Sequence, residues 1–308
     1  MAIKDYEFWF VVGTQFLYGE EIFDVINDHA AQMAAEWSEK LPCKVVAKPC
    51  VKTSKEILTV MQQANNDEKC AGVITWMHTF SPSKMWIAGF NALEKPYLHV
   101  NTQFNRDIPW DDIDMDFMNL NQSAHGDREH GYIAARMRLK QKVVAGYWKD
   151  ETFQNKMGVW MRAAVGAAES RKLRVLRISD NMRNVAVTDG DKIEAQIKLG
   201  WQVDHYGVGD IIKLVDAVTK DEIDAQMAEY NKYYEMDTDN IDSVRYQARE
   251  EVAIKKFLDK EGFGAFHTNF EDLQGLRQLP GLASSTLFHD KQQKTGKRCK
   301  KAPEQDGS

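Results

Sequence analysis

The chain has 308 residues, which is enough for two domains of ordinary size, and 43% hydrophobic and 28% charged residues are typical of a globular protein. A net charge of −6 and a pI near 5.8 argue against nucleic acid as a partner, and no apolar run approaches the ~20 residues that span a bilayer, so we expect no membrane partner either. The N-terminus lacks the basic and apolar regions of a signal peptide, which predicts a cytoplasmic protein.

Short apolar strands alternate with amphipathic helices in the first half of the chain. Residues 7–12 are rich in aromatic and β-branched side chains, which predicts a strand buried on both faces. Apolar residues at helical spacing predict a helix over 20–40, and the capping-box pattern from Thr53 to Glu56 predicts the start of another. The other predicted elements are strands at 43–47, 71–76, 97–100 and 143–148, and helices that begin at 81–82 and lie around 133–139.

A second series of the same kind follows a boundary that we place among the small residues of 163–168. Its predicted strands are 173–178, 203–206 and 264–267, and its predicted helices are 191–199, 221–234 and 243–260. Strands separated by helices of this length predict parallel sheets covered on both faces. We therefore expect an α/β protein with two doubly wound, Rossmann-like domains, residues 1–168 and 169–283, of which the second is incomplete.

The segment 115–129 mixes amides, a histidine and charged side chains with apolar residues. Gln122 and His125 belong to it, and a buried amide costs roughly 1–3 kcal/mol unless its hydrogen bonds are made. One interpretation is a well-satisfied helix N-terminus with Ser123 and Asp127 as caps. The other is that these polar groups face a polar ligand.

Polar side chains also follow the predicted strands, where ligands bind in open parallel sheets. They are Thr14 and Gln15, then His78, Thr79 and Ser81, then Asn101, Thr102 and Gln103, then Asp180, Asn181 and Arg183, and finally Thr268 and Asn269. Aromatic residues such as Phe16, Tyr18 and Phe270 lie among them. Amides with aromatic faces are typical of sugar sites, although ordinary packing also explains any single aromatic residue.

Templates for other chemistry do not fit this sequence. No G-x-x-x-x-G-K-[ST] loop or G-x-S-x-G turn is present, and Gly207-Val208-Gly209 lacks the third glycine of a dinucleotide site. His125 and His130 are five residues apart and would not share a helix face as metal ligands do. The four cysteines have no CxxC spacing, so neither a zinc site nor a redox site is expected.

Five ordered motifs resemble those of bacterial L-arabinose isomerases over residues 5–283. They are WFVVGTQFLYG at 9–19, WMHTFSP at 76–82, MDFMNLNQSAHG at 115–126, DNMR at 180–183 and TNFEDL at 268–273. The resemblance implies an enzyme of arabinose catabolism that interconverts L-arabinose, or a related aldose, and L-ribulose. It also implies a divalent metal, usually manganese, a β-rich third domain and a hexamer.

The resemblance also implies roles for individual residues. Gln15, Met182 and Phe270 match positions that contact the sugar, and we assign Gln122 to the substrate as well. The residue that matches His125 reaches the site of a neighbouring subunit, so His125 is the predicted catalytic residue. A histidine near a reacting hydroxyl can donate or relay a proton at neutral pH.

The sequence departs from the family at two positions and at its end. Phe16 stands where the family usually has histidine, and Ser179 where it usually has glycine. The two glutamates and two histidines that bind the family's metal are not recognisable, so we expect no metal ligands and no β-rich third domain in this chain. We expect the chain alone to be inactive. The alternatives are a non-catalytic sugar-binding or subunit-like fragment, and a misassembled fragment without function.

The final residues, 284–308, form a lysine-rich tail without apolar periodicity, which predicts disorder. We interpret this divergent tail as a frame-shifted or prematurely ended reading of the gene. A nucleic-acid-binding tail is the alternative.

Overall fold

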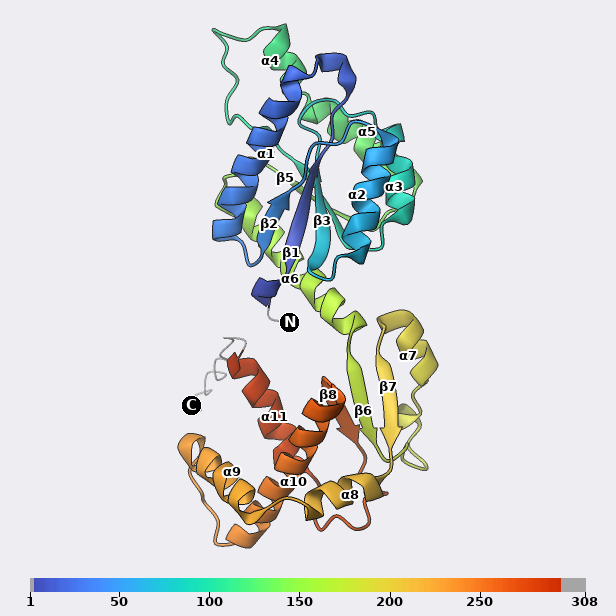
Figure 1. Ribbon diagram of the computed structural model, residues 1–308, viewed down its shortest axis with the longest axis vertical. Coiled ribbons are helices and arrows are strands. Elements are labelled where there is room, and N and C mark those ends of the chain that lie inside the picture. The colour runs from blue at the N-terminus through green and yellow to red at the C-terminus, as the bar shows by residue number, and fades with distance from the viewer. Residues whose placement is uncertain (1–2, 295–308) are drawn as a thin grey trace, which may run out of the picture. The chain divides into compact units, whose positions relative to one another are not determined.

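The computed structural model describes the backbone of residues 3–294 and the side chains of residues 3–287. Two compact units divide the chain, Met1–Glu169 and Ser170–Ser308, one residue from the boundary expected at 168. Each contains a parallel sheet with helices packed on it (Figure 1), which confirms the predicted α/β class. Within residues 3–294, no helix is both long enough and apolar enough to cross a bilayer.

The first unit is built on a five-stranded sheet in the order β2-β1-β3-β4-β5, and all its pairs are parallel. Its strands are β1 (Glu7–Val12), β2 (Lys44–Ala47), β3 (Cys70–Trp76), β4 (Tyr97–Asn101) and β5 (Gln141–Ala145). Strand β1 lies between β2 and β3, and its Phe8 is opposite Val45 of β2 and Gly72 of β3. Doubly wound sheets of this order bind ligands beyond the carboxyl ends of β1 and β3.

Helices cover both faces of this sheet. They are α1 (Glu21–Lys40), α2 (Ser54–Asn66), α3 (Ile87–Ala92), α4 (Met115–Leu120), α5 (Ser123–Arg136) and α6 (Glu151–Arg171). Helices α1 and α6 lie on one face and α2 and α3 on the other (Figure 1). Because successive strand residues point to opposite faces, Phe8 and Phe10 share a core with Trp37 of α1, whereas Trp9 and Val11 pack in a second core with α2 and α3.

Two helices of the first unit differ from their prediction. The Thr53 hydroxyl accepts from the Glu56 N–H (3.2 Å), but the Glu56 carboxylate accepts from the Lys52 N–H (2.6 Å), so only half of the capping box forms. Residues 163–168, which we interpreted as a boundary, lie inside α6. Alanine dominates this stretch and has the highest helix propensity, so small residues here extend a helix instead of ending one.

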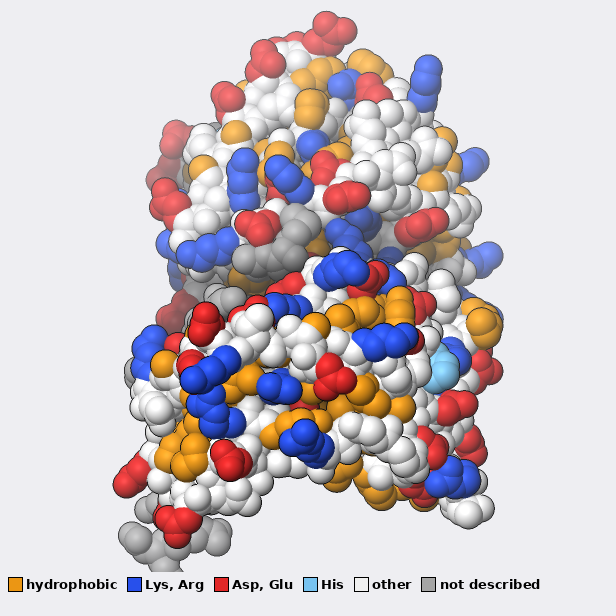
Figure 2. Space-filling model, turned by 60° about the horizontal axis from the view of Figure 1, so that its bottom comes forward, with side chains coloured by type: hydrophobic (Ala, Val, Ile, Leu, Met, Phe, Trp, Pro, Cys, Tyr) orange, Lys and Arg blue, Asp and Glu red, His pale blue; other side chains and the backbone are white. Residues whose placement is uncertain are grey.

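The second unit contains a three-stranded parallel sheet in the order β7-β6-β8. Its strands are β6 (Arg174–Ile178), β7 (Gln202–Tyr206) and β8 (Ala265–Thr268), and its helices are α7 (Lys192–Leu199), α8 (Val208–Asp216), α9 (Lys220–Tyr233), α10 (Ile241–Glu261) and α11 (Gly281–Lys294). Leu176 and Ile178 of β6 share a core with residues of α8, α9 and α10. Acidic and basic side chains mix on the face in Figure 2, with hydrophobic side chains between them.

Helix α11 corrects the disorder that we predicted from residue 284. The chain is helical through Lys294, and Ala283 is fully buried in the core that it shares with α10. Leu282, Ala283, Thr286 and Leu287 form a short stripe at helical spacing. That stripe is too short to stand out beside the lysines that follow. The rest of the predicted tail, residues 295–308, lies outside the described residues.

A buried carboxyl group lies where α10 meets the segment that leads into α11. Glu250 is fully buried, and its Oε2 accepts a hydrogen bond from Gln247 Nε2 (2.9 Å). The other end of Gln247 accepts from the Leu282 N–H (3.1 Å). Burial raises the pKa of Glu250 from its usual 4.5 to about 8. The folded chain therefore binds this proton more tightly than the unfolded chain, and stability falls as the pH rises from 4.5 to about 8.

We expect Glu250→Gln to remove this pH dependence, because glutamine keeps the shape of the protonated acid and cannot ionise. The free energy of unfolding should match the wild type near pH 4 and exceed it by on the order of 5 kcal/mol above pH 8. Urea unfolding at a series of pH values measures the difference. Asp259→Asn, at an exposed position of the same helix, is the control. A difference between Glu250→Gln and the wild type that stays constant with pH would contradict the assignment.

Ser179 follows β6 in a backbone conformation that favours glycine. Its φ of 66° lies in the left-handed region, where a side chain costs about 1–2 kcal/mol. The Ser179 N–H also donates to the Tyr206 carbonyl (3.0 Å), so the pairing of β6 and β7 holds this residue in place. This geometry gives a physical reason for the glycine that the family usually has here.

Ser179→Gly is expected to stabilise the chain by up to ~1 kcal/mol, which is the relieved strain less the extra entropy that glycine loses on folding. The thermal midpoint should rise by a few degrees, as measured by calorimetry. Ser179→Ala keeps the strain and serves as the matched variant. Equal destabilisation by both substitutions would show that the serine hydroxyl, and not the backbone, decides stability here.

Candidate functional site

Gln15 lies at the carboxyl end of β1, on a loop held close to the end of β3. Its side-chain Nε2 donates to the Tyr18 hydroxyl (3.2 Å) across the short 3-10 helix η2 (Phe16–Tyr18). The preceding Thr14 is buried and accepts a hydrogen bond from the Thr79 hydroxyl (2.8 Å). A Cβ on Gly13 would lie 2.6 Å from Ser81 Oγ, so only glycine allows this approach. These contacts fix the start of the loop against the residues that follow β3, and the side chain of Gln15 on this loop is half-buried.

His78 follows β3 but is part of the interior. Its ring stacks on Trp76 with centroids 4.2 Å apart, and its Nε2 lies 2.7 Å from Nδ1 of His29. Burial, and to a lesser degree the neighbouring His29, lowers the pKa of His78 to about 3. His78 is thus neutral at physiological pH. Its carbonyl accepts from the Gln122 N–H (3.1 Å), which ties the start of α5 to the end of β3.

Gln122 and His125 lie together at the start of α5. Gln122 is the N-cap residue, and its side chain donates to Asn119 Oδ1 (3.2 Å). The His125 side chain is exposed, and its ring stacks on Phe80 with centroids 4.5 Å apart. An accessible imidazole held by one stacking contact can exchange protons with a ligand and still keep its position.

The predicted caps of this segment are wrong. The Ser123 hydroxyl donates to the Thr102 carbonyl (2.7 Å), and Asp127 accepts from His99 (2.8 Å), so neither caps a helix. The segment forms two helices instead of one, and Asp114 caps the first of them through the Phe117 N–H (2.8 Å). Cross-chain partners outcompete local capping here, and sequence spacing does not reveal them.

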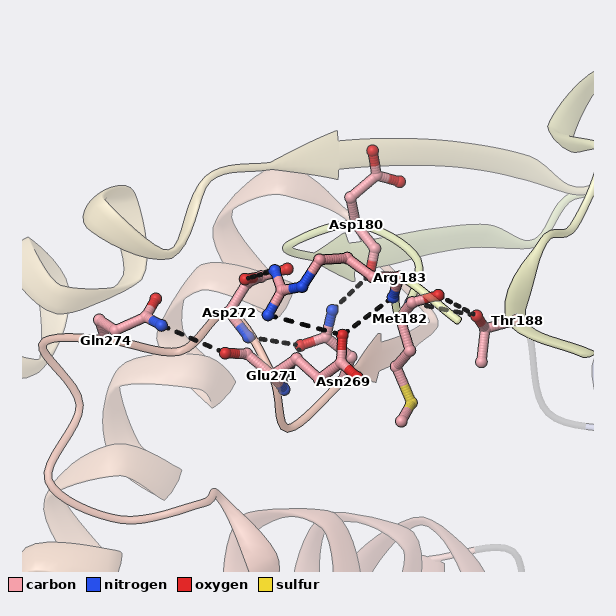
Figure 3. A network of polar contacts seen from close by, with 8 residues as sticks. All are labelled: Asp180, Met182, Arg183, Thr188, Asn269, Glu271, Asp272 and Gln274. Atoms are coloured by element: carbon pink, nitrogen blue, oxygen red, sulfur yellow. Dashed lines mark hydrogen bonds and ion pairs between the residues drawn. The ribbon is translucent and has the colours of Figure 1, made fainter. Parts of the chain in front are cut away.

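Met182 and Phe270 belong to the second unit, on the loops that follow β6 and β8. Asn269 joins these loops, because its side-chain amide donates to the Asp180 carbonyl. Its Oδ1 accepts the N–H groups of Glu271 (3.1 Å) and Asp272 (3.2 Å). Figure 3 shows these contacts around Asn269.

Arg183 provides a second connection between the two loops. Its N–H donates to Glu271 Oε2 (2.9 Å), and its Nη1 pairs with Asp272 Oδ1 (2.6 Å) (Figure 3). The Met182 N–H donates to the Thr188 hydroxyl (3.1 Å), which closes the first loop on itself. Met182 and Phe270 are therefore presented by one cross-linked frame, and Phe270 remains 65% exposed on it.

Sequence reasoning identified the two motifs of this frame but assigned only Met182 and Phe270 within them. Arg183 and Asn269 were expected among the polar residues that follow the strands, but their role with Asp272 in positioning the two loops was not predicted. The sequence contains one signal for this arrangement. Arg183 in the motif DNMR and the acidic residues in the motif TNFEDL suggest an ion pair between the two loops. The structure brings Gln122 and His125 together in the first unit, with Gln15 at the same edge of that sheet. It places Met182 and Phe270 together in the second unit.

Each edge presents groups that are able to contact a polyhydroxylated ligand. The first offers two amides, a phenol and an imidazole, and the second offers a thioether and a phenyl ring. Among the described residues, no three His, Cys, Asp or Glu side chains are grouped so as to hold a metal ion.

Each of the two units matches a known family of protein domains. Residues 2–172 match the family model of the L-arabinose isomerase N-terminal domain, and residues 174–293 match that of its central domain. The similarity thus continues about ten residues past 283, where we placed its end. The matched part of the tail is family sequence, and the predicted divergence from residue 284 is wrong as far as residue 293.

Three curated relatives show how much of the chain is shared. It is 55% identical over 290 residues to the L-arabinose isomerase of Clostridium beijerinckii, which covers 94% of the chain and 59% of that protein. The corresponding enzyme of Shouchella clausii is 53% identical over 92% of the chain, and that of Bacillus subtilis is 50% identical over 94%. The chain spans about 60% of the length of these relatives. It belongs to the L-arabinose isomerase family, and its two units correspond to the family's N-terminal and central domains.

Proposed function

We propose that this chain carries the sugar-contacting residues of an L-arabinose isomerase site, and that the 308-residue chain alone binds L-arabinose without converting it to L-ribulose. The observation that carries the proposal is the frame around Asn269, which holds Phe270 exposed on a cross-linked loop. Phe270 is 65% exposed, so most of this aromatic side chain is accessible to a ligand. It is suited to the C–H face of a sugar.

Gln15 and Gln122 are proposed to hydrogen-bond with the hydroxyl groups of the sugar, because a side-chain amide can both donate to and accept from a hydroxyl. His125 is the group proposed to hold or relay a proton at a sugar oxygen. Interconversion of an aldose and a ketose moves protons between two carbons and two oxygens, and in the family a manganese ion is expected to stabilise the charge that develops. The chain's own residues are proposed to bind and orient the sugar.

The cellular setting is proposed from family membership. We place the chain in the cytoplasm, in arabinose catabolism, and as one subunit of a homohexamer. L-Arabinose or a related aldose is the proposed ligand. Phe16, which is exposed beside Gln15, is the position at which preference among aldoses would be set.

L-Arabinose is expected to raise the thermal midpoint of the purified chain, with no ketose formed when manganese is added. Phe270→Ala should weaken binding at least roughly tenfold in calorimetry, about 1.4 kcal/mol, because it removes the aromatic face. Ile197→Ala removes another exposed apolar side chain of the same unit and should leave binding unchanged. Manganese-dependent ketose formation would overturn the proposed lack of turnover. Absence of any L-arabinose binding would overturn the sugar-binding role.

A subunit-like role is the second candidate, and the exposure of His125 favours it. A catalytic histidine that projects from its own unit is placed to serve another copy. The chain can be mixed with a full-length relative in which the matching histidine is replaced by alanine. Ketose formation should return on mixing with the wild-type chain and not with its His125→Ala variant. Equal activity in both mixtures would contradict this role.

A further inference from the structure

The first unit contains a pocket of about 580 Å³ at the carboxyl ends of β4 and β5, beside the start of α5. Its lining residues are mostly polar, and those used below are Asn101, Gln103, Arg106, Asp127, Arg128 and Tyr147. None of Gln15, Gln122 and His125 lines it. The volume lies within the range of about 300–1,000 Å³ that small-molecule sites occupy.

Two side chains of the pocket wall have unmet hydrogen-bonding capacity. The amide oxygens of Asn101 and Gln103 are buried, and neither meets a donor among the described residues. The intervening Thr102 is itself buried. Leaving a buried polar group unpaired costs about 1–3 kcal/mol. Two unpaired groups in one wall of the pocket therefore indicate hydrogen-bond partners that the folded chain does not supply.

Asp127 adds a carboxylate held in a fixed orientation. Its Oδ1 accepts from His99 Nε2 (2.8 Å), and His99 Nδ1 lies 2.8 Å from the Thr75 hydroxyl. Burial raises the pKa of Asp127, and the His99 hydrogen bond opposes this shift. The second carboxylate oxygen makes no hydrogen bond to the described residues. It can therefore accept a hydrogen bond from a hydroxyl group in the pocket.

Positive charge dominates the remaining lining. Arg128 is exposed, and its side chain pairs with no acceptor in the described part of the chain. Arg106 pairs with Asp150 (3.0 Å) and lies 5.2 Å above the Tyr147 ring. Gln122, at the N-cap of α5, makes no side-chain cap, and the His125 and Gly126 N–H groups donate to its carbonyl, so the Ser123 and Ala124 N–H groups beside the pocket are the ones that can donate to a ligand. Because Arg106 is paired with Asp150, Arg128 is the cation that the lining leaves for an anionic ligand.

We propose that this pocket binds a small anionic polyol, a monosaccharide that carries a phosphate or a carboxylate group. The oxyanion lies against Arg128, Arg106 and the first turn of α5, which together form a cationic end. The sugar hydroxyls lie against the amide groups of Asn101 and Gln103 and the carboxylate of Asp127. The Tyr147 ring faces the C–H surface of the sugar.

Calorimetric titration of the full chain with ribose 5-phosphate, ribonate, ribose and inorganic phosphate tests the proposal. The first two probes share a polyol end and differ in the oxyanion, so they separate phosphate from carboxylate ligands. At least one of them should bind, more tightly than ribose and more tightly than phosphate. Arg128→Ala should weaken that binding at least tenfold. Arg136→Ala removes an exposed arginine from the same helix, away from the pocket, and should have no effect.

Gln103→Leu provides a second variant, because leucine has a similar size and cannot hydrogen-bond. It should weaken ribose 5-phosphate or ribonate and leave inorganic phosphate unchanged. Absence of binding by both anionic sugars would overturn the proposal. So would ribose binding as tightly as its anionic forms, or phosphate alone binding as tightly as the sugar phosphate. Loss of L-arabinose binding in Phe270→Ala is measured separately, so failure of this proposal is distinct from failure of the proposed function.

Discussion

The burial of β1 on both faces is the constraint on which the first unit depends. Every side chain from Phe8 to Val12 is buried, with alternate residues in two different cores. Such a strand has no surface on which to carry a functional group, so polar chemistry is confined to the ends of the sheet. Gln15 and His78 follow their strands and Asn101 ends its strand for this reason, and the proposed sugar contacts of this unit and the proposed anion pocket lie at the carboxyl edge.

The polar groups at this edge differ in what the surrounding chain does to them. His78 is enclosed between Trp76 and His29 and is held neutral, so it positions α5 through its carbonyl. His125 stacks on a single ring and stays accessible. In the second unit, Asn269 connects two loops, because its side-chain amide forms hydrogen bonds with three backbone groups on them. Burial separates residues that organise the site from residues available to a ligand.

Much of the fold was predictable because strands and helices here follow local patterns strongly. The buried strands, the helix over 20–40 and the alternation of the two element types all appear as expected. The errors have a common origin in context. Alanines at 163–168 extend α6, and the short stripe around Ala283 forms a helix because α10 offers it a surface to pack on. Ser123 and Asp127 are caps by spacing, but each bonds to a distant strand or loop.

The sequence by itself determined the α/β class, the two-part organisation and the family, because hydrophobic period and ordered motifs are written along the chain. It also marked Gln15, Gln122, His125, Met182 and Phe270 as candidates. Only the tertiary structure decided which polar residues are supports and which remain free. That outcome depends on partners far apart in sequence, such as His99 and Asp127 or Arg183 and Asp272. Hydrogen bonds of this kind require the strands to be paired first, so no local pattern encodes them.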